Sequence, residues 1–164
     1  MDQIVEMIVE NFGGKVAKEL IVFVISMIPI LELRGSILAA GFLDMEFLST
    51  FIVAVIGNML PIPFILLFID KIFSWLKKTR WKNMIEKLES RALAKSGQIQ
   101  KYGKVGLFLF VAIPLPGTGA WTGALAASLL RMKPKESIFP IFMGVVTAGL
   151  IMSLLAFGII KQII

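Results

Sequence analysis

Residues 113–128, with the sequence IPLPGTGAWTGALAAS, decide the fold of this chain. They lie inside a longer apolar run that is interrupted by Pro114, Pro116, Gly117 and Gly119. Proline removes a backbone hydrogen-bond donor and disrupts the preceding helical turn, whereas glycine adds backbone freedom that a helix must freeze. The run is therefore predicted to form two helices, one beginning near Val105 and one running from Thr118 or Gly119 through Ala127.

Each of these predicted helices has roughly ten residues, about half of the 20 that a helix needs to cross a bilayer. We expect a re-entrant hairpin, which enters the membrane, breaks at its tip and leaves on the same side. Non-helical backbone at membrane depth is stable only where it is buried in protein or lines a cavity. The hairpin should therefore be packed inside the molecule.

The composition indicates an all-α integral membrane protein. Of the 164 residues, 57% are hydrophobic and 17% are charged, whereas soluble domains have about 45–50% apolar and about 25% charged residues. The chain has no cysteine and no histidine, which excludes thiolate and imidazole chemistry. We expect neither an enzyme nor a cofactor. The length favours a single membrane domain, residues 1–164, as a multi-pass protein of the cell (cytoplasmic) membrane.

The rest of the chain is predicted to form a second hairpin, two spanning helices and surface helices. In order, we expect a hairpin within residues 20–43, a span at 47–75, a basic amphipathic helix on the cytoplasmic surface within 76–104, the hairpin at 105–130 and a span at 137–160. Pro61 and Pro63 predict a kink in the first span. Residues 2–12 predict either an amphipathic surface helix or a frayed terminus.

Two segments, residues 20–75 and 105–161, are predicted to be copies of each other. The matching positions are Ile28-Pro29 with Ile113-Pro114, Ala39-Ala40 with Ala124, Met45 with Met132, and Gly57 with Gly144. A hairpin returns to its own side and a span crosses, so the copies would have opposite orientations. Inverted repeats with broken helices are a transporter architecture.

The charge distribution favours two re-entrant hairpins over four ordinary spans. Four spans would place the basic segment 76–104 and the cluster of Arg131, Lys133 and Lys135 on opposite sides. Two re-entrant hairpins place both on one side, in agreement with the positive-inside rule, and put both termini outside. The net charge of +6 then indicates contact with anionic lipids, and we expect no nucleic-acid binding.

Glu32 and Arg34 are ionisable residues deep in an apolar run. A charge at membrane depth costs on the order of 3 kcal/mol on insertion scales and usually marks a transport pathway or a proton site. In the functional interpretation, Glu32 holds a proton or a cation and Arg34 contacts an anion. In the structural interpretation, they form a pair or cap the broken helix ends.

The tip of the second hairpin is a candidate anion site. Backbone N–H groups from Gly117 to Ala120 begin a helix, where the dipole and the free donors favour an anion, although packing alone could require the break. Trp121 lines the cavity or faces lipid, and Asn58 joins the polar centre or makes one interhelical hydrogen bond. The predicted substrate- or ion-binding residues are Glu32, Arg34, Gly35, Asn58, Pro114, Pro116, Gly117, Thr118, Gly119, Trp121 and Thr122, with no catalytic or metal-binding residue.

Two segments carry a family resemblance. Pro29 with the following Glu32-Leu33-Arg34-Gly35, and residues 114–123 with the sequence PLPGTGAWTG, resemble the signature segments of the small multi-drug export proteins. That family is similar to the DedA superfamily, which includes the VTT-domain proteins. The resemblance covers nearly the whole chain and implies two re-entrant loops that face each other. It also implies lipid translocation, including undecaprenyl phosphate recycling, and proton-dependent drug phenotypes, with Arg131 as the nearest match to the DedA arginines.

These patterns together predict a proton- or ion-coupled transporter or flippase for an anionic amphipathic lipid such as a polyprenyl phosphate. The alternatives are a small multidrug exporter and a non-transporting membrane scaffold. A polar cavity that reaches both Glu32 and Gly117 would favour transport, whereas dry, packed tips would favour a scaffold. The expected partners are membrane lipids and a second copy of the chain in a homodimer.

Overall fold

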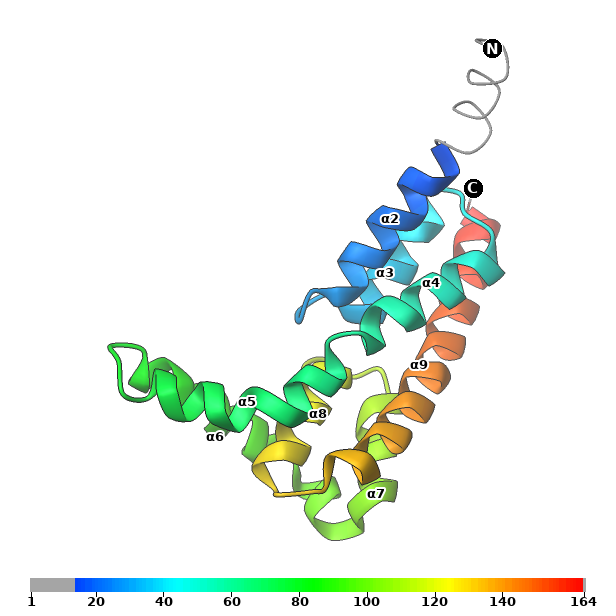
Figure 1. Ribbon diagram of the computed structural model, residues 1–164. Helices are drawn as coiled ribbons and strands as arrows, with labels where there is room; N and C mark the ends of the chain where they lie inside the picture. The colour runs from blue at the N-terminus through cyan, green and yellow to red at the C-terminus, as the bar shows by residue number, and fades with distance from the viewer. Residues whose placement is uncertain (1–13, 164) are drawn as a thin grey trace.

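The computed structural model describes the backbone of residues 14–163 and the side chains of residues 14–158, and this part of the chain is helical with no strand. The amphipathic helix predicted at residues 2–12 lies outside the described residues. In chain order the helices are α2 (Gly14–Met27), α3 (Glu32–Phe42), α4 (Phe47–Met59), α5 (Ile62–Leu76), α6 (Lys82–Lys95), α7 (Gly97–Ala112), α8 (Ala120–Leu129) and α9 (Pro134–Ile163) (Figure 1).

Two helical segments are long and apolar enough to cross a membrane. The first, Phe47–Leu76, comprises α4 and α5, and the second is Pro134–Gly158 of α9. Pro61 separates α4 from α5, and α5 leaves the line of α4 so that α5 and α6 project to one side of the molecule (Figure 1). The predicted kink in the first span is therefore confirmed.

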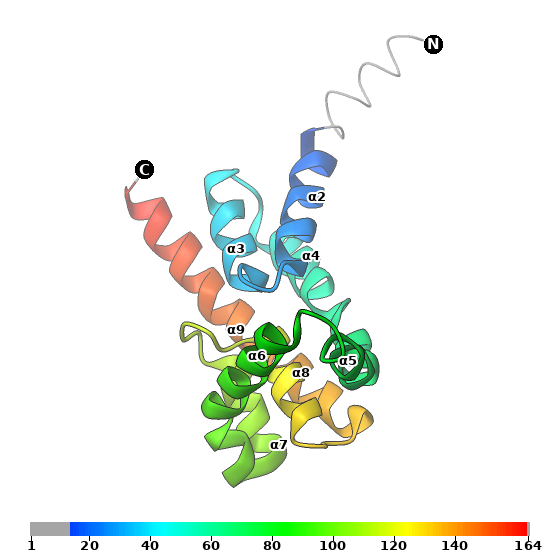
Figure 2. The same ribbon diagram turned by 90° about the vertical axis from the view of Figure 1, so that its left-hand side faces the viewer.

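Helices α2 and α3 form a pair that returns toward its own start. The turn between them is closed by the backbone N–H of Glu32, which donates to the carbonyl oxygen of Ile28 at 2.8 Å. At the other end of the pair, the ammonium of Lys18 donates to the carbonyl oxygen of Leu43 at 2.7 Å. The beginning of α2 and the end of α3 therefore lie at the same end of the molecule (Figure 2).

Helices α7 and α8 form the second pair, and the break between them lies where the prolines and glycines predict it. The helix before the break begins earlier than expected, at Gly97, because α7 includes a sharp turn at Gly103, where φ is +58°. The turn brings Gly106 against the backbone of Gln98, since a Cβ at Gly106 would lie 2.7 Å from the carbonyl carbon of Gln98. The predicted start near Val105 corresponds to the part of α7 that follows this turn.

One shift in residue number relates several element boundaries of the second half of the chain to those of the first half. The shift takes Phe47, the first residue of α4, to Pro134, the first residue of α9. It also takes Asp44 to Arg131, and these two non-glycine residues have nearly the same left-handed backbone, with φ of +51° and +59°. Left-handed backbone is uncommon outside glycine, so its recurrence at matching positions reflects a shared turn.

The helix caps before the two spans match as well. In the first half, the N–H groups of Leu43 and Met45 donate to the carbonyls of Ala39 and Ala40, and in the second half those of Leu130 and Met132 donate to the carbonyls of Ala126 and Ala127. Ala39-Ala40 therefore corresponds to Ala126-Ala127 and not to Ala124. The same shift takes Pro29 to Pro116 and not to Pro114.

Helix packing follows the same correspondence. Helix α2 packs on α4 as α7 packs on α9, while α3 packs on α9 and α8 packs on α5. Glycines allow the close approaches: a Cβ at Gly57 would lie 2.8 Å from the carbonyl oxygen of Phe23 in α2, and one at Gly144 would lie 3.0 Å from that of Phe108 in α7. The second helix of each pair thus packs on the span of the other half, which brings the two tips together.

Candidate functional site at the paired tips

The two tips line one cavity of about 530 Å³. The first tip contributes Pro29, Ile30, Leu31, Glu32, Arg34 and Gly35, and the second contributes Pro114, Leu115, Pro116, Gly117, Thr118 and Thr122, with Met152 of α9 at one side. Most of the residues predicted to bind substrate or ions therefore surround a single space. Under the shift between the halves, Pro29 and Pro116, and Gly35 and Thr122, are corresponding pairs.

Glu32 binds the start of α8. Its side chain is almost completely buried, and its two carboxyl oxygens accept hydrogen bonds from the backbone N–H groups of Ala120 at 3.2 Å and Trp121 at 3.1 Å. These are orphan donors at the positive end of the helix dipole, where an anion is favoured. The anion at this helix start is therefore the chain's own carboxylate. One of its donors, Ala120, is among the predicted N–H groups, and the other, Trp121, is the next residue.

The backbone on both sides of this contact is unusual. Gly119 has φ of +145°, and a Cβ at this position would lie 2.7 Å from the carboxyl carbon of Glu32. Glu32 itself has φ of +50°, a conformation that non-glycine residues rarely adopt. Strained backbone of this kind persists only where the surrounding structure enforces it, and it gathers at functional sites.

Arg34 binds the other end of the break. Its guanidinium donates to the carbonyl oxygens of Leu115 at 2.6 Å and Ile113 at 3.3 Å, and to the hydroxyl of Thr118 at 3.1 Å. These carbonyls follow the end of α7, the negative end of its dipole. Glu32 and Arg34 therefore cap the broken helix ends, as in the structural interpretation of the pair, but the ends that they cap belong to the opposite hairpin.

Two further contacts anchor the second tip, one to the end of α2 and one to α6. The indole N–H of Trp121 donates to the carbonyl oxygen of Met27, the last residue of α2, at 3.1 Å, and Trp121 does not line the cavity. The ammonium of Lys95, at the end of α6, lies 3.5 Å from the carbonyl oxygen of Gly117. Nothing in the sequence distinguishes Lys95 from the other lysines of the basic segment.

Asn58 and Gly119 line a second, much smaller cavity of about 10 Å³ next to Glu32, Leu33 and Ala120. Asn58 is buried, and its Oδ1 has no hydrogen-bond partner among the described residues. Among these residues, this oxygen therefore does not make the one interhelical hydrogen bond that is the alternative for Asn58. The space is about what a single buried water requires.

Arg131 lies away from the tips. Its guanidinium is 3.3 Å from a carboxyl oxygen of Asp70, whose other oxygen accepts a hydrogen bond from the hydroxyl of Ser128 at 3.1 Å. The arginine that the resemblance suggested as a match therefore pairs with a carboxylate of α5. In the part of the chain that the structure describes, no group of three or more acidic residues could hold a metal ion.

Comparison with known proteins identifies a family. Residues 32–151 match the family described as "Putative small multi-drug export protein". This range includes Glu32 and Arg34 of the first tip, the whole second tip, the first apolar segment and most of the second. No curated protein and no solved structure matches the chain. Because the match covers most of the chain and the two long apolar segments suit a bilayer, this chain belongs to the small multi-drug export protein family of membrane proteins.

Proposed function

We propose that this protein is a membrane transporter whose substrate occupies the cavity between the two tips. The observation that carries the proposal is the cavity of about 530 Å³ that reaches both Glu32 and Gly117. Small-molecule sites usually have volumes of about 300–1,000 Å³ and combine apolar walls with a few polar groups. A scaffold built only for packing would instead have closed its tips.

The proposal includes two re-entrant hairpins in an inverted repeat, in the cytoplasmic membrane. Four ordinary spans would place Lys104 and Glu136 on opposite faces of a hydrocarbon layer about 30 Å thick. Their charged groups are 3.0 Å apart, and Lys18 likewise contacts Leu43 across the ends of the first pair. Both contacts support hairpins that return to their own side, with the basic end of the molecule in the cytoplasm.

The substrate class that the electrostatics favour is an amphipathic anion. Arg34 and Lys95 bring two positive charges to the second tip, and Glu32 brings one negative charge. The other walls are largely apolar prolines and aliphatic side chains, such as Leu31 and Leu115. A lipid phosphate, for example a polyprenyl phosphate as the resemblance to DedA proteins implies, suits this combination of charge and apolar surface.

Glu32 is the proposed coupling site. An ionised Glu32 satisfies the N–H groups of Ala120 and Trp121. Protonation removes the negative charge from the start of α8, which leaves these donors and the helix dipole available to an anionic substrate. Proton and substrate would then alternate at the same helix end.

The test compares transport of two probes in proteoliposomes, a fluorescent lipid phosphate and a lipophilic phosphonium cation. We expect the wild type to move the phosphate. Lys95→Met should slow it about fivefold, since one lysine near a phosphate contributes about 1 kcal/mol. Lys87→Met, an exposed lysine elsewhere on α6, is the matched control and should leave transport unchanged.

Export of a lipophilic cation is the second candidate, because the description of the family names multi-drug export and the buried carboxylate of Glu32 could pair with a cationic drug. Glu32 would then act as the counter-ion of the substrate. Transport of the phosphonium ion without transport of the lipid phosphate would overturn the anion proposal in favour of this alternative. Failure of the reconstituted protein to move either probe would favour the scaffold.

A further inference from the structure

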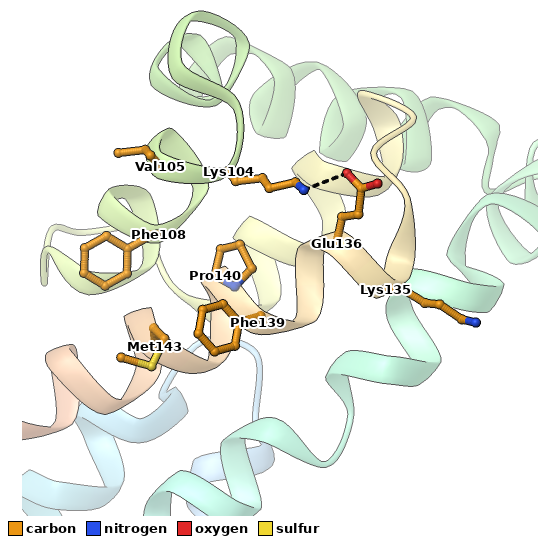
Figure 3. A pocket seen from close by; sticks show the side chains of 8 residues that line it. All are labelled: Lys104, Val105, Phe108, Lys135, Glu136, Phe139, Pro140 and Met143. Atoms are coloured by element: carbon orange, nitrogen blue, oxygen red, sulfur yellow. Dashed lines mark ion pairs between the residues drawn. The ribbon is translucent and has the colours of Figure 1, made fainter.

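A long groove lies between α7 and α9, away from the tips. It has a volume of about 630 Å³ and shares no lining residue with the tip cavity. Val105 and Phe108 line it from α7, and Phe139 and Met143 line it from α9 (Figure 3). Val105 and Phe139 are 62% and 69% exposed, so the walls of this groove are largely uncovered apolar surface.

One end of the groove is charged. Lys104 lies 3.0 Å from the carboxylate of Glu136 there (Figure 3). Lys133 approaches the same carboxylate at 3.7 Å. Lys135 also lines the groove and makes no ion pair with any carboxylate among the described residues. Lys104 and Lys133 thus share one carboxylate and Lys135 has none in the described part of the chain, which leaves a positive excess at this end of the apolar groove.

We propose that this groove binds an anionic phospholipid, with the headgroup phosphate at Lys104 and an acyl chain along Phe108 and Phe139. The arrangement reproduces the layers of a membrane leaflet, a charged plane above hydrocarbon. Basic pockets between membrane helices recognise anionic headgroups in this way. Since the groove is separate from the transport cavity, the lipid is a resident ligand and not the transported substrate.

Charge complementarity selects this occupant over two others. A lipophilic cation would meet the positive excess at the mouth. A second copy of the chain, related by a two-fold axis along the membrane normal, would bring the same patch against itself. The lysines of both copies would then lie at the same depth and repel each other.

The experiment uses the full chain in a neutral detergent and measures its thermal stabilisation by phosphatidylglycerol and by phosphatidylcholine with the same acyl chains. We expect the wild type to bind phosphatidylglycerol at least about tenfold more tightly. The double variant Lys104→Gln/Lys135→Gln should lose this preference. The double variant Lys82→Gln/Lys87→Gln, which removes the same charge from α6, should retain it.

The place where the lipid binds is tested separately in the wild-type protein, so that the conclusion does not depend on a variant that misfolds. Phosphatidylglycerol with a photoreactive acyl chain should crosslink to peptides that contain Val105 or Phe139 in the wild type. Equal binding of the two lipids, or crosslinks confined to the tips, would overturn the proposal. Crosslinking between two copies through this groove would show an oligomer interface instead. The transport assay with Lys95→Met tests the tip cavity and not the groove. A negative result in that assay would contradict the proposed function without changing the meaning of the lipid-binding result.

Discussion

Glu32 and Arg34 are two residues apart in the chain, yet they bind the two opposite ends of one broken helix. On a regular helix, residues at i and i+2 do not share a face. The left-handed backbone of Glu32, with φ of +50°, turns its side chain to α8 while Arg34 reaches the end of α7. Each charge meets the dipole end of opposite sign, so the pair locks one tip to the other.

The contribution of Glu32 can be measured with Glu32→Gln. The amide keeps one acceptor oxygen but loses the charge and presents an NH₂ group to a backbone N–H. We expect a loss of about 1–3 kcal/mol, the usual penalty for an unsatisfied buried group, seen as a lower melting temperature in detergent. Glu46→Gln is the control, because the Glu46 side chain is 81% exposed and its pair with Lys15 is long at 3.8 Å. Equal melting temperatures for both variants would show that the carboxylate does not hold the tips.

Gly119→Ala tests the close approach of backbone and carboxylate. A Cβ there would lie 2.7 Å from the carboxyl carbon of Glu32, on backbone that favours glycine. We expect a loss of about 1–3 kcal/mol from strain together with displacement of Glu32, measured by thermal denaturation. Gly97→Ala is the control, since a Cβ at Gly97 would have no atom within 4 Å. A tolerated Gly119→Ala would mean that the tip adjusts freely and that the contact is not enforced.

At the scale of helices, each half has a glycine where its spanning helix contacts the first helix of the hairpin in the same half. The two glycines occupy corresponding positions. Gly57 faces α2 and Gly144 faces α7. Small residues allow membrane helices to approach closely. Because the contacts correspond, substitutions at the two positions should have similar effects.

Gly57→Ala and Gly144→Ala are therefore expected to destabilise the protein by comparable amounts, each about 1–3 kcal/mol, as in overpacked cores. The added methyl would meet the carbonyl oxygen of Phe23 at 2.8 Å in one case and the Cβ of Val111 at 2.6 Å in the other. Gly158→Ala, with no atom within 4 Å of its Cβ, should be neutral in the same denaturation assay. A large difference between the first two variants would argue against equivalent packing in the halves.

The sequence predicted the helix breaks well, because proline and glycine act locally. The break after Ala112, the start of α8 near Gly119 and the kink at Pro61 follow directly from these residues. The partners of Glu32 and Arg34 could not be predicted, since they lie more than 75 residues away in the chain and depend on how the two halves pack. The contact of Lys95 with the tip likewise depends on tertiary packing.

At the scale of the whole molecule, charged contacts lie near both ends of α9. Lys18 reaches Leu43 and Lys15 lies near Glu46 at the end where the first hairpin begins and finishes. Lys104 meets Glu136 at the end where α9 begins. The apolar length of α9 separates these two ends (Figure 1), which suits a protein whose ends lie on different sides of a bilayer.

This arrangement predicts the outcome of cysteine labelling in a chain that contains no cysteine of its own. Glu46→Cys and Lys133→Cys replace side chains that are each 81% exposed. With two re-entrant hairpins, one span separates positions 46 and 133, so a membrane-impermeant maleimide should reach them from opposite sides. With four ordinary spans, two spans separate these positions and both would label from one side.

Lys87→Cys provides the internal reference for this experiment, since it lies on the exposed surface of α6. Two re-entrant hairpins place it on the same side as position 133, and the positive-inside rule makes that side cytoplasmic. Four spans place positions 87 and 133 on opposite sides. The two topologies therefore give opposite answers at both pairs of positions. If positions 46 and 133 label from the same side and positions 87 and 133 label from opposite sides, the hairpins are ordinary spans. The proposed mechanism would then have no inverted repeat.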